Sequence, residues 1–421
     1  EEVLDKFVIY GGNKISGEIF IKPAKNALLP SLAASLLTSE KVVFEQTSSL
    51  VDIFSMVSLL QQLGVEVNGT IGGEITLTAK NVLSLVAPYD LVSKMRASIL
   101  VLGPLLARYN RAKVSLPGGC AIGARPVDQH IKGLKALGAS IDFKEGYVVA
   151  SCDKGLKGGE IFFDKVTVGG TENILMASVL AKGRTTIYNA AKEPEVVDLG
   201  NLLIKMGAKI EGLGSDKLII EGVEELKGAS HTPIPDRIEC GTLLVAAATT
   251  KGKIEVKNCI PGHLQAFLTK LEEMGYEIKL KENSIFLNGE IEPKSVDITT
   301  APYPGFPTDL QAQFVTLLTQ SSGSSTVREE IFETRFMHIP ELQRLGADIK
   351  LEGSVAIVKG KTKLKGAEVM ASDLRASASL VIAGLVAEGK TTVHRIYHLD
   401  RGYEKFEERL SSLGAIIERE K

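Results

Sequence analysis

Cys120 lies on a bare stretch of the sequence, residues 116–130, which reads LPGGCAIGARPVDQH. Gly118, Gly119 and Gly123 are close to it in the chain, whereas a structural cysteine normally has bulky apolar neighbours. Glycines leave the backbone unencumbered, so this thiol can be presented to a reactant. The alternative is a surface turn that contains a small hydrophobic side chain, and this stretch alone does not separate the two.

Arginine recurs on the loops that lead into three expected helices, at Arg125, Arg335 and Arg401. Because a helix N-terminus already carries about half a positive charge, an arginine beside it is unfavourable unless an anion binds there. Guanidinium groups suit phosphate and carboxylate, so the pattern predicts an anion-binding site. The alternative is that each arginine pairs with an acid of its own loop. Those acids are Asp128, Glu333 and Asp400.

Two further arginines, Arg96 in KMRASI and Arg375 in DLRASAS, stand at related helix starts. Lys25, in KPAKNALLP, lies beside Asn26 where prolines bound a crossing between domains. A cluster of Lys25, Arg125 and Arg401, with the glycine-loop thiol, would suit a small molecule that carries both phosphate and carboxylate. Since the net charge of the chain is only −2, such a positive field must be local.

Asp309 stands at the start of an expected helix in APYPGFPTDLQAQF, after three prolines within six residues. An aspartate in this place is by default an N-cap, which stabilises a helix by about 1 kcal/mol. A rigid loop held by prolines also suits a carboxylate that is positioned as a general base. The sequence leaves both interpretations open.

Two motif-like patterns are set aside. GLVAEGKT, residues 384–391, matches the phosphate-binding loop letter for letter, but that loop needs a strand before it and a helix after it. Here the expected helix SASLVIAGLVAEG comes first and the expected strand TTVHRI second. His394 and His398 are four residues apart in a strand and turn, where that spacing does not place both rings on one helix face. We therefore expect neither a nucleotide loop nor a metal site.

The elements that must position these residues form a sixfold repeat, with segments such as LQQLGVEV and LKALGASI. L-x-x-L/M-G is typical of the apolar stripe at the end of a helix that a glycine closes, and the following alternation begins a strand. Successive glycines are 74, 69, 68, 71 and 68 residues apart, a period too regular for chance. The glycines are Gly64, Gly138, Gly207, Gly275, Gly346 and Gly414.

A second, alanine-rich helix precedes each of these, as in TLLVAAATTKGKIEVKN, and is apolar on several faces. Helices of that kind are buried, so we expect an α/β fold with helices inside and sheets outside. Prolines in GASHTPIPDRIECG divide the six units into two groups of three. We expect a C-terminal lobe of residues 1–24 and 235–421, which includes the first strand, and an N-terminal lobe of residues 25–234. Two crossings between lobes favour a hinge with a cleft.

Composition limits the classes of function. The 421 residues are 44% hydrophobic and 24% charged, which is typical of globular proteins of two or three domains. The net charge gives no basic field for nucleic acid, and the longest apolar stretch, residues 97–107, is too short to span a bilayer. Four cysteines without a C-x-x-C spacing fit a reducing cytosol. We expect a cytoplasmic protein without nucleic-acid partners or membrane insertion.

Taken together, these stretches resemble the UDP-N-acetylglucosamine enolpyruvyl transferases of peptidoglycan precursor synthesis, over essentially the whole chain. The resemblance implies a pair of inside-out α/β barrels built from six βα repeat units, in agreement with the repeats above. The segments that carry it are AKNALLP, APYDLVSKMRASI, LPGGCAIGARPVDQHI, DKVTVGGTENILMAS, NAAKEPEVVDL, TAPYPGFPTDLQAQF, FETRFMHIPEL, MASDLRASASLVIAGL and IYHLDRGYE.

The resemblance also implies roles for particular residues. Lys25, Arg125 and Arg401 match the cations that hold phosphoenolpyruvate. Cys120, on a mobile lid of residues 116–126, matches the acid that protonates or attacks it. Residues that match the walls of the site are Arg335, Asp373 and Arg375. Residues that match the sugar-nucleotide contacts are Asn26, Arg96, Arg125, Pro126, Val127, Asp128, Gln129, Lys165, Val166, Thr167, Val168, Asp309 and Ile331.

The implied reaction is an addition followed by an elimination between phosphoenolpyruvate and UDP-N-acetylglucosamine. C3 of phosphoenolpyruvate is protonated, the 3-hydroxyl of the sugar, deprotonated by Asp309, attacks C2, and phosphate leaves. Positive groups stabilise the charge throughout, and an ordinary thiol, with a pKa of about 8.5, is protonated near neutrality and can act as the acid. We expect no cofactor, a monomer, and alkylation of Cys120 by the epoxide fosfomycin.

Two alternatives remain open on the sequence. A shikimate-type enolpyruvyl transferase shares the fold and the phosphoenolpyruvate site, although PGGC and PTDLQAQF favour the sugar nucleotide. A non-catalytic anion-binding paralogue would keep the repeats, but it would not need Lys25, Cys120, Asp309 and Arg401 together.

Overall fold

A computed structural model describes residues 4–116 and 127–421, which form two compact units. The N-terminal unit contains residues 23–116 and 127–234, and the C-terminal unit contains residues 4–22 and 235–421. Pro23 and Ala24, which the sequence places with the C-terminal lobe, belong to the N-terminal unit. The reason is local, because the amide of Ala24 donates a hydrogen bond to the carbonyl of Ile234, 2.8 Å away.

Within the described residues, the strands form six four-stranded sheets, three in each unit. The sheets of the N-terminal unit are β14 (Ala229–His231), β3 (Lys41–Phe44), β5 (Ile75–Thr78) and β4 (Glu66–Gly69); β6 (Val86–Ala87), β7 (Arg111–Ser115), β9 (Tyr147–Ser151) and β8 (Ser140–Lys144); and β10 (Glu160–Phe162), β11 (Arg184–Tyr188), β13 (Lys217–Glu221) and β12 (Lys209–Glu211). Those of the C-terminal unit are β2 (Gly17–Phe20), β15 (Lys253–Lys257), β17 (Ser284–Asn288) and β16 (Glu277–Leu280); β18 (Ile298–Thr299), β19 (Gly323–Arg328), β21 (Val355–Gly360) and β20 (Asp348–Glu352); and β22 (Glu368–Met370), β23 (Lys390–His394), β1 (Lys6–Tyr10) and β24 (Ile416–Glu420).

All six sheets share one pairing scheme. The first strand in each order pairs parallel with the second, and the remaining pairs are antiparallel. In the N-terminal unit β14, which follows the third repeat, pairs with β3 of the first repeat. In the C-terminal unit the first segment of the chain makes the same connection, because β1 pairs with β23 and β24 of the last repeat and β2 pairs with β15 of the first. Each unit is therefore a closed ring of three repeats.

Inner helices fill each ring, and outer helices lie against them. The inner helices are α1 (Lys25–Ala34), η1 (Ser35–Leu37), η2 (Arg96–Val101), α4 (Leu102–Tyr109) and α6 (Val168–Ser178) in the N-terminal unit, and α8 (Arg237–Thr250), η4 (Thr308–Leu310), α10 (Gln311–Leu318) and α12 (Leu374–Val386) in the C-terminal unit. The outer helices are α2 (Val51–Leu63), α5 (Asp128–Ala136), α7 (Pro194–Lys205), α9 (Gln265–Glu273), α11 (His338–Arg344) and α14 (Phe406–Ser412), and short helices are α3 (Tyr89–Val92), η3 (Pro261–Leu264) and α13 (Tyr397–Asp400).

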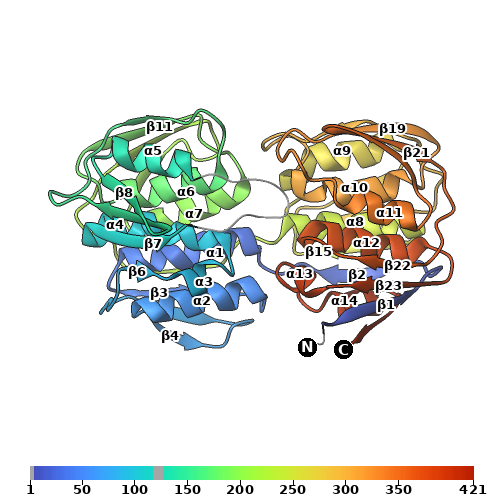
Figure 1. The fold of residues 1–421 in the computed structure, drawn as a ribbon, viewed down its shortest axis with the longest axis horizontal. Coiled ribbons are helices and arrows are strands. Elements are labelled where there is room, and N and C mark those ends of the chain that lie inside the picture. The colour runs from blue at the N-terminus through green and yellow to red at the C-terminus, as the bar shows by residue number, and fades with distance from the viewer. Residues whose placement is uncertain (1–3, 117–126) are drawn as a thin grey trace. The chain divides into compact units, whose positions relative to one another are not determined.

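Alanine and glycine let the inner helices approach one another closely. In the C-terminal unit α8, α10 and α12 pack together, and β19 and β21 run along the outside of α10 (Figure 1). A Cβ atom on Gly241 of α8 would lie 2.6 Å from the side chain of Leu310, so a larger residue there would force Leu310 to move. Each unit has a hydrophobic core of its own, and the prediction of inner helices and outer sheets is confirmed.

The six repeat glycines all end helices, as the sequence predicts. Their φ angles lie between 95° and 109°, the left-handed region that glycine adopts without strain. The helix α12 also precedes β23 across GLVAEGKT, so this segment is a helix-to-strand turn. No helix in the described part of the chain is long and apolar enough to cross a bilayer.

Candidate active site

Three of the predicted site residues, Cys120, Arg125 and Pro126, lie outside the described residues. The others divide between the two units.

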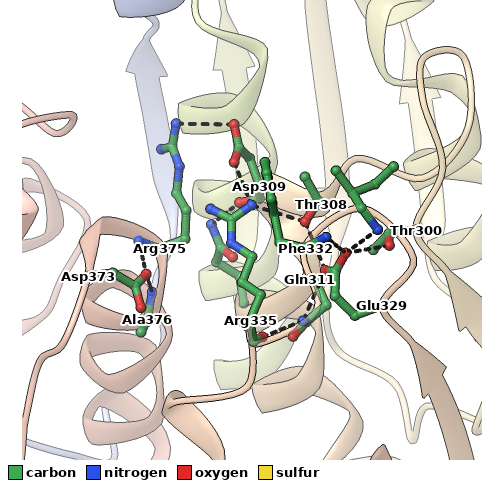
Figure 2. A network of polar contacts seen from close by, with 12 residues as sticks. Thr300, Thr308, Asp309, Gln311, Glu329, Phe332, Arg335, Asp373, Arg375 and Ala376 are labelled. Carbon is green, nitrogen blue, oxygen red and sulfur yellow. Dashed lines mark hydrogen bonds and ion pairs between the residues drawn. The ribbon is translucent and has the colours of Figure 1, made fainter. Parts of the chain in front are cut away.

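In the C-terminal unit, Asp309 lies at the centre of a group of arginines (Figure 2). Its Oδ1 atom is 2.8 Å from Nη1 of Arg335, and its Oδ2 atom is 3.7 Å from Nη2 of Arg375. Both guanidinium groups are buried, whereas the side chain of Asp309 is 28% exposed. The predicted wall residues Arg335 and Arg375 thus contact the predicted base, which keeps an open side.

Arg375 is held by an aromatic ring as well as by charge. Its guanidinium carbon is 5.3 Å from the ring centre of Tyr403, whose hydroxyl is 2.8 Å from that of Thr242. Burial lowers the pKa of Arg375, but Tyr403, Asp309 and Asp236 together outweigh this effect and raise it above its ordinary value. Arg375 is a permanent buried cation that stabilises an anion beside it.

The default interpretation of Asp309 as a helix cap is wrong. Pro307 precedes the 3₁₀ helix η4 and no side-chain hydrogen bond caps it, because the carboxylate of Asp309 points to the arginines instead. Asp373 is the N-cap of its helix, where it accepts hydrogen bonds from the amides of Arg375 (3.1 Å) and Ala376 (3.0 Å). This capping role accounts for the place of Asp373 beside the cluster.

Arg401 lies at the end of α13, five residues before α14 begins, so it does not stand directly at a helix start. The sequence left open a pairing of Arg401 with Asp400. In the structure, the two carboxylate oxygens of Asp400 instead accept hydrogen bonds from Nη1 and Nη2 of Arg419, at 2.9 and 2.7 Å. Ile331, a predicted sugar-nucleotide contact, lies in the turn that leads to Arg335.

Sequence reasoning missed Glu329, which anchors that turn. Its side chain is 1% exposed and accepts five hydrogen bonds from the surrounding chain. The alternation of β19 carried a signal, since Ser325 and Val327 are buried and Glu329 is the next residue on the same face. A carboxylate on a buried face indicates a polar network rather than a solvated surface.

In the N-terminal unit, the predicted phosphoenolpyruvate ligand Lys25 begins the inner helix α1. Its Nζ atom is 3.0 Å from Oδ2 of Asp52, and the side chains are 11% and 3% exposed. Asn26 follows it and is exposed. A lysine at a helix start pairs here with an acid of α2, which offsets the positive end of the helix.

Arg96 begins η2 in the same unit, and its charge disfavours the protonated form of the buried His130 of α5. Burial lowers the pKa of His130 to about 4, while Asp128 raises it and Arg96 lowers it. Asn173 fixes the ring, because its Nδ2 atom is 3.0 Å from Nδ1 of His130.

The structure brings together two sequence-distant groups of predicted sugar-nucleotide contacts, one at the start of α5 and one before α6. Gln129 exchanges hydrogen bonds with Asp164 at 2.9 and 3.2 Å, which ties α5 to the loop that carries Lys165. Thr167 is the N-cap of α6 and accepts from the amide of Gly170. Val127 and Val168 are partly exposed, and the exposed residues are Asp128, Lys165 and Val166.

Three buried acids, Glu172, Glu193 and Glu195, also lie in the N-terminal unit. Burial, followed by repulsion from Glu195 and Glu193, raises the pKa of Glu172 well above its ordinary value. The neutral form of the Glu172 side chain is therefore favoured relative to that of an ordinary glutamate, and no motif in the sequence singles this residue out.

Chemically, the C-terminal unit presents an acceptor carboxylate stabilised by two guanidinium groups, and the N-terminal unit presents lysine and arginine at helix starts. The carboxylate of the C-terminal unit can take a proton from a hydroxyl, and the cations of the N-terminal unit can hold anionic groups. In the described part of the chain, no group of three histidine, cysteine, aspartate or glutamate side chains is placed to hold a metal ion.

Comparisons with known proteins agree with this chemistry. A family model described as EPSP synthase (3-phosphoshikimate 1-carboxyvinyltransferase) matches residues 9–410. A protein of Koribacter versatilis (strain Ellin345) named UDP-N-acetylglucosamine 1-carboxyvinyltransferase is 55% identical over 419 residues, which cover 99% of this chain and 96% of the relative.

Solved structures share the fold. The enolpyruvyl transferase NikO from Streptomyces tendae has a TM-score of 0.90 and 25% identity over 99% of both chains. EPSP synthase from Acinetobacter baumannii has a TM-score of 0.78 at 18% identity over 100% of both chains, which shows the fold alone. The chain therefore belongs to the enolpyruvyl transferase family, that of EPSP synthase (3-phosphoshikimate 1-carboxyvinyltransferase).

Proposed function

We propose that this chain transfers the enolpyruvyl group of phosphoenolpyruvate to the 3-hydroxyl of UDP-N-acetylglucosamine and releases phosphate, the first committed step of peptidoglycan synthesis. The observation that carries the proposal is the 55% identity, over 99% of the chain, to a relative named for this reaction. The geometry around Asp309 supports it, because a partly exposed carboxylate between two buried arginines suits proton transfer from a hydroxyl.

The reaction is an addition followed by an elimination. A proton is added to C3 of phosphoenolpyruvate, Asp309 accepts the proton of the sugar 3-hydroxyl, and the oxygen forms a bond to C2. The C2–O bond to phosphate then breaks, and loss of a proton from C3 restores the double bond. We assign the first proton to Cys120 and the phosphoenolpyruvate contacts to Lys25, Arg125 and Arg401.

Phosphate release, measured with phosphoenolpyruvate and each of two acceptors, tests the function. We expect release with UDP-N-acetylglucosamine and none with 3-phosphoshikimate. Release only with 3-phosphoshikimate would assign the chain to the other reaction of its family, and release with neither acceptor would favour a non-catalytic anion-binding paralogue.

The role of Cys120 has a separate test. Cys120→Asp should retain activity, most at low pH where the carboxyl group stays protonated, whereas Cys120→Ser should be much weaker because a hydroxyl is a poor acid. An epoxide that resembles phosphoenolpyruvate, such as fosfomycin, should label Cys120 in peptide mass mapping. The described cysteines Cys152, Cys240 and Cys259 are buried, so label on any of them, or full activity in Cys120→Ser, would contradict the assignment.

We also propose that the enzyme is a cytoplasmic monomer. Free thiols at the three described cysteines fit a reducing compartment, and both substrates are small phosphorylated molecules. Light scattering after size-exclusion chromatography tests the monomer, and a mass near 90 kDa, about twice the 45.2 kDa of the chain, would contradict it.

A further inference from the structure

Glu329 directly follows β19 and is the most fully hydrogen-bonded carboxylate near Asp309 in the described C-terminal unit (Figure 2). Its side chain is 1% exposed, and both oxygens serve only as acceptors. The donors are the hydroxyls of Thr300 (2.7 Å) and Thr308 (2.8 Å), Nε2 of Gln311 (3.2 Å), and the amides of Ile331 (2.9 Å) and Phe332 (3.2 Å).

The two oxygens hold different parts of the chain. Oε2 accepts from Thr300 and from the amides of Ile331 and Phe332, so it fixes the start of the turn that carries Arg335. Oε1 accepts from Thr308 and Gln311, the residues on either side of Asp309 and Leu310. A single carboxylate thus ties the turn with Arg335 to the helix start with Asp309.

Both donors to Oε1 also reach Arg335. Nη1 of Arg335 donates to the hydroxyl oxygen of Thr308 at 3.0 Å, and Nε2 of Gln311 donates to the backbone carbonyl of Arg335 at 2.8 Å. The same Nη1 atom is 2.8 Å from Oδ1 of Asp309. Arg335 is therefore held at its backbone and at its guanidinium by groups that Glu329 orients.

We propose that Glu329 is a positioning residue for the reaction: it sets the place of Arg335 and, through Arg335, the place of the Asp309 carboxylate. The proposal rests on the proposed function, in which Asp309 accepts the proton of the acceptor hydroxyl. Glu329 itself is enclosed by protein groups and does not touch substrate.

The direction of the hydrogen bonds explains why a carboxylate is needed. Because Thr308 donates its proton to Glu329, its oxygen lone pairs face Arg335. A glutamine at position 329 would have almost the same shape. With its NH₂ group in the place of Oε1, the orientation that keeps the three hydrogen bonds to Oε2, it would point that group at the other two donors. Thr308 would then have to turn its hydroxyl proton elsewhere, and the contact with Arg335 would loosen.

The test compares Glu329→Gln with Glu330→Gln, the same change at the exposed neighbour. With saturating phosphoenolpyruvate and UDP-N-acetylglucosamine, we expect kcat to fall about 10- to 100-fold in Glu329→Gln, because a small misplacement of a reacting group costs that much. We expect KM for the sugar nucleotide to change less than about threefold, and Glu330→Gln to match the wild type. An unchanged kcat, or a KM effect as large as the kcat effect, overturns the proposal.

A double-mutant cycle separates positioning from loss of stability. In an Arg335→Met background, Glu329→Gln should lower kcat less than about threefold, since the group through which it acts is gone. An equal loss in both backgrounds would mean that Glu329 acts only on the fold, and would overturn the proposal.

If Glu329→Gln does not fold, Thr308→Val carries the test, because it leaves Glu329 and four of its five hydrogen bonds in place and removes the hydroxyl that links Glu329 to the guanidinium. It should lower kcat about 5- to 10-fold at unchanged KM, and wild-type kcat in this variant overturns the proposal. A wild-type protein that releases no phosphate with either acceptor would instead refute the proposed function and this proposal with it.

Discussion

The second repeat of each unit places a buried histidine at the same position, eight residues before the glycine that ends its outer helix. These are His130 before Gly138 and His338 before Gly346. In the other four repeats this position is filled by a buried apolar side chain. Those residues are Met56, Leu199, Phe267 and Phe406.

The two histidines have different surroundings. Asn173 accepts a hydrogen bond from the amide of Gly103 at 2.6 Å, which orients its NH₂ group toward His130. Nε2 of His338 has no hydrogen-bond partner among the described residues. Burial lowers the pKa of His338 to about 4, while Asp373 raises it and Arg335 lowers it.

The repeat thus determines where the backbone runs, while polar substitutions within it determine the chemistry. In the N-terminal unit the polar side chain, His130, is buried and hydrogen-bonded to the buried Asn173. In the C-terminal unit the same repeat position borders Arg335 and Asp373, beside the candidate base.

The largest effect should come from Asp309→Asn. The amide keeps the size of the side chain but cannot accept the hydroxyl proton, so we expect kcat to fall about 10²- to 10⁴-fold. Affinity for UDP-N-acetylglucosamine, measured by calorimetry, should change far less. Glu333→Gln, at an exposed acid of the nearby turn, is the control and should retain full turnover. Equal losses of binding and rate would mean that Asp309 holds substrate rather than accepts a proton.

Breaking the ion pair between Lys25 and Asp52 in the N-terminal unit should above all lower the stability of the fold. Asp52→Ala leaves the nearly buried Lys25 without this partner, and we expect the free energy of unfolding to fall by about 3 kcal/mol. KM for phosphoenolpyruvate should rise as well. Calorimetric unfolding checks this, with Asp153→Ala as control because the Asp153–Arg111 pair is exposed and should contribute little. A loss no larger than that of the control would mean that the pair adds nothing to the fold.

The histidines predict a loss of stability in acid. Both have a pKa of about 4 in the folded protein, below the ordinary value of 6.5, so the unfolded chain binds more protons between these values. Stability is therefore complete above pH 6.5 and falls as the pH drops toward 4, by about 2 kcal/mol for each group at pH 5. The melting temperatures of His130→Leu and His338→Leu should depend less on pH than that of the wild type.

At pH 7 the same two variants should differ from each other. His130→Leu removes the partner of Asn173 and should be destabilised, whereas His338→Leu should melt close to the wild type. If both variants melt alike at pH 7, the hydrogen bond of His130 does not distinguish the two repeats.

The backbone was more predictable than the site. Six glycines with one spacing specify helix ends because glycine alone reaches a left-handed φ without strain, and the enolpyruvyl transferase resemblance is confirmed. The partners of Asp309 are 26 and 66 residues away in sequence, and no local rule links such positions. Local reasoning therefore favoured an N-cap at Asp309, where the long-range ion pairs prevail.

The smallest effect concerns the repeat glycines that end the outer helices. The same glycine-to-alanine change in two repeats shows whether equivalent positions tolerate it equally. Gly207→Ala would meet only one atom, 4.0 Å away on Leu226, so its cost is the left-handed φ of an alanine, about 1 kcal/mol. In Gly64→Ala, the new methyl group would lie 2.7 Å from both the carbonyl oxygen of Asn81 and the amide nitrogen of Leu83, so the backbone must also shift. We expect Gly64→Ala to lower the melting temperature clearly more than Gly207→Ala. Equal shifts would mean that φ alone sets the cost, and that the contact of Gly64 with the segment after β5 relaxes freely.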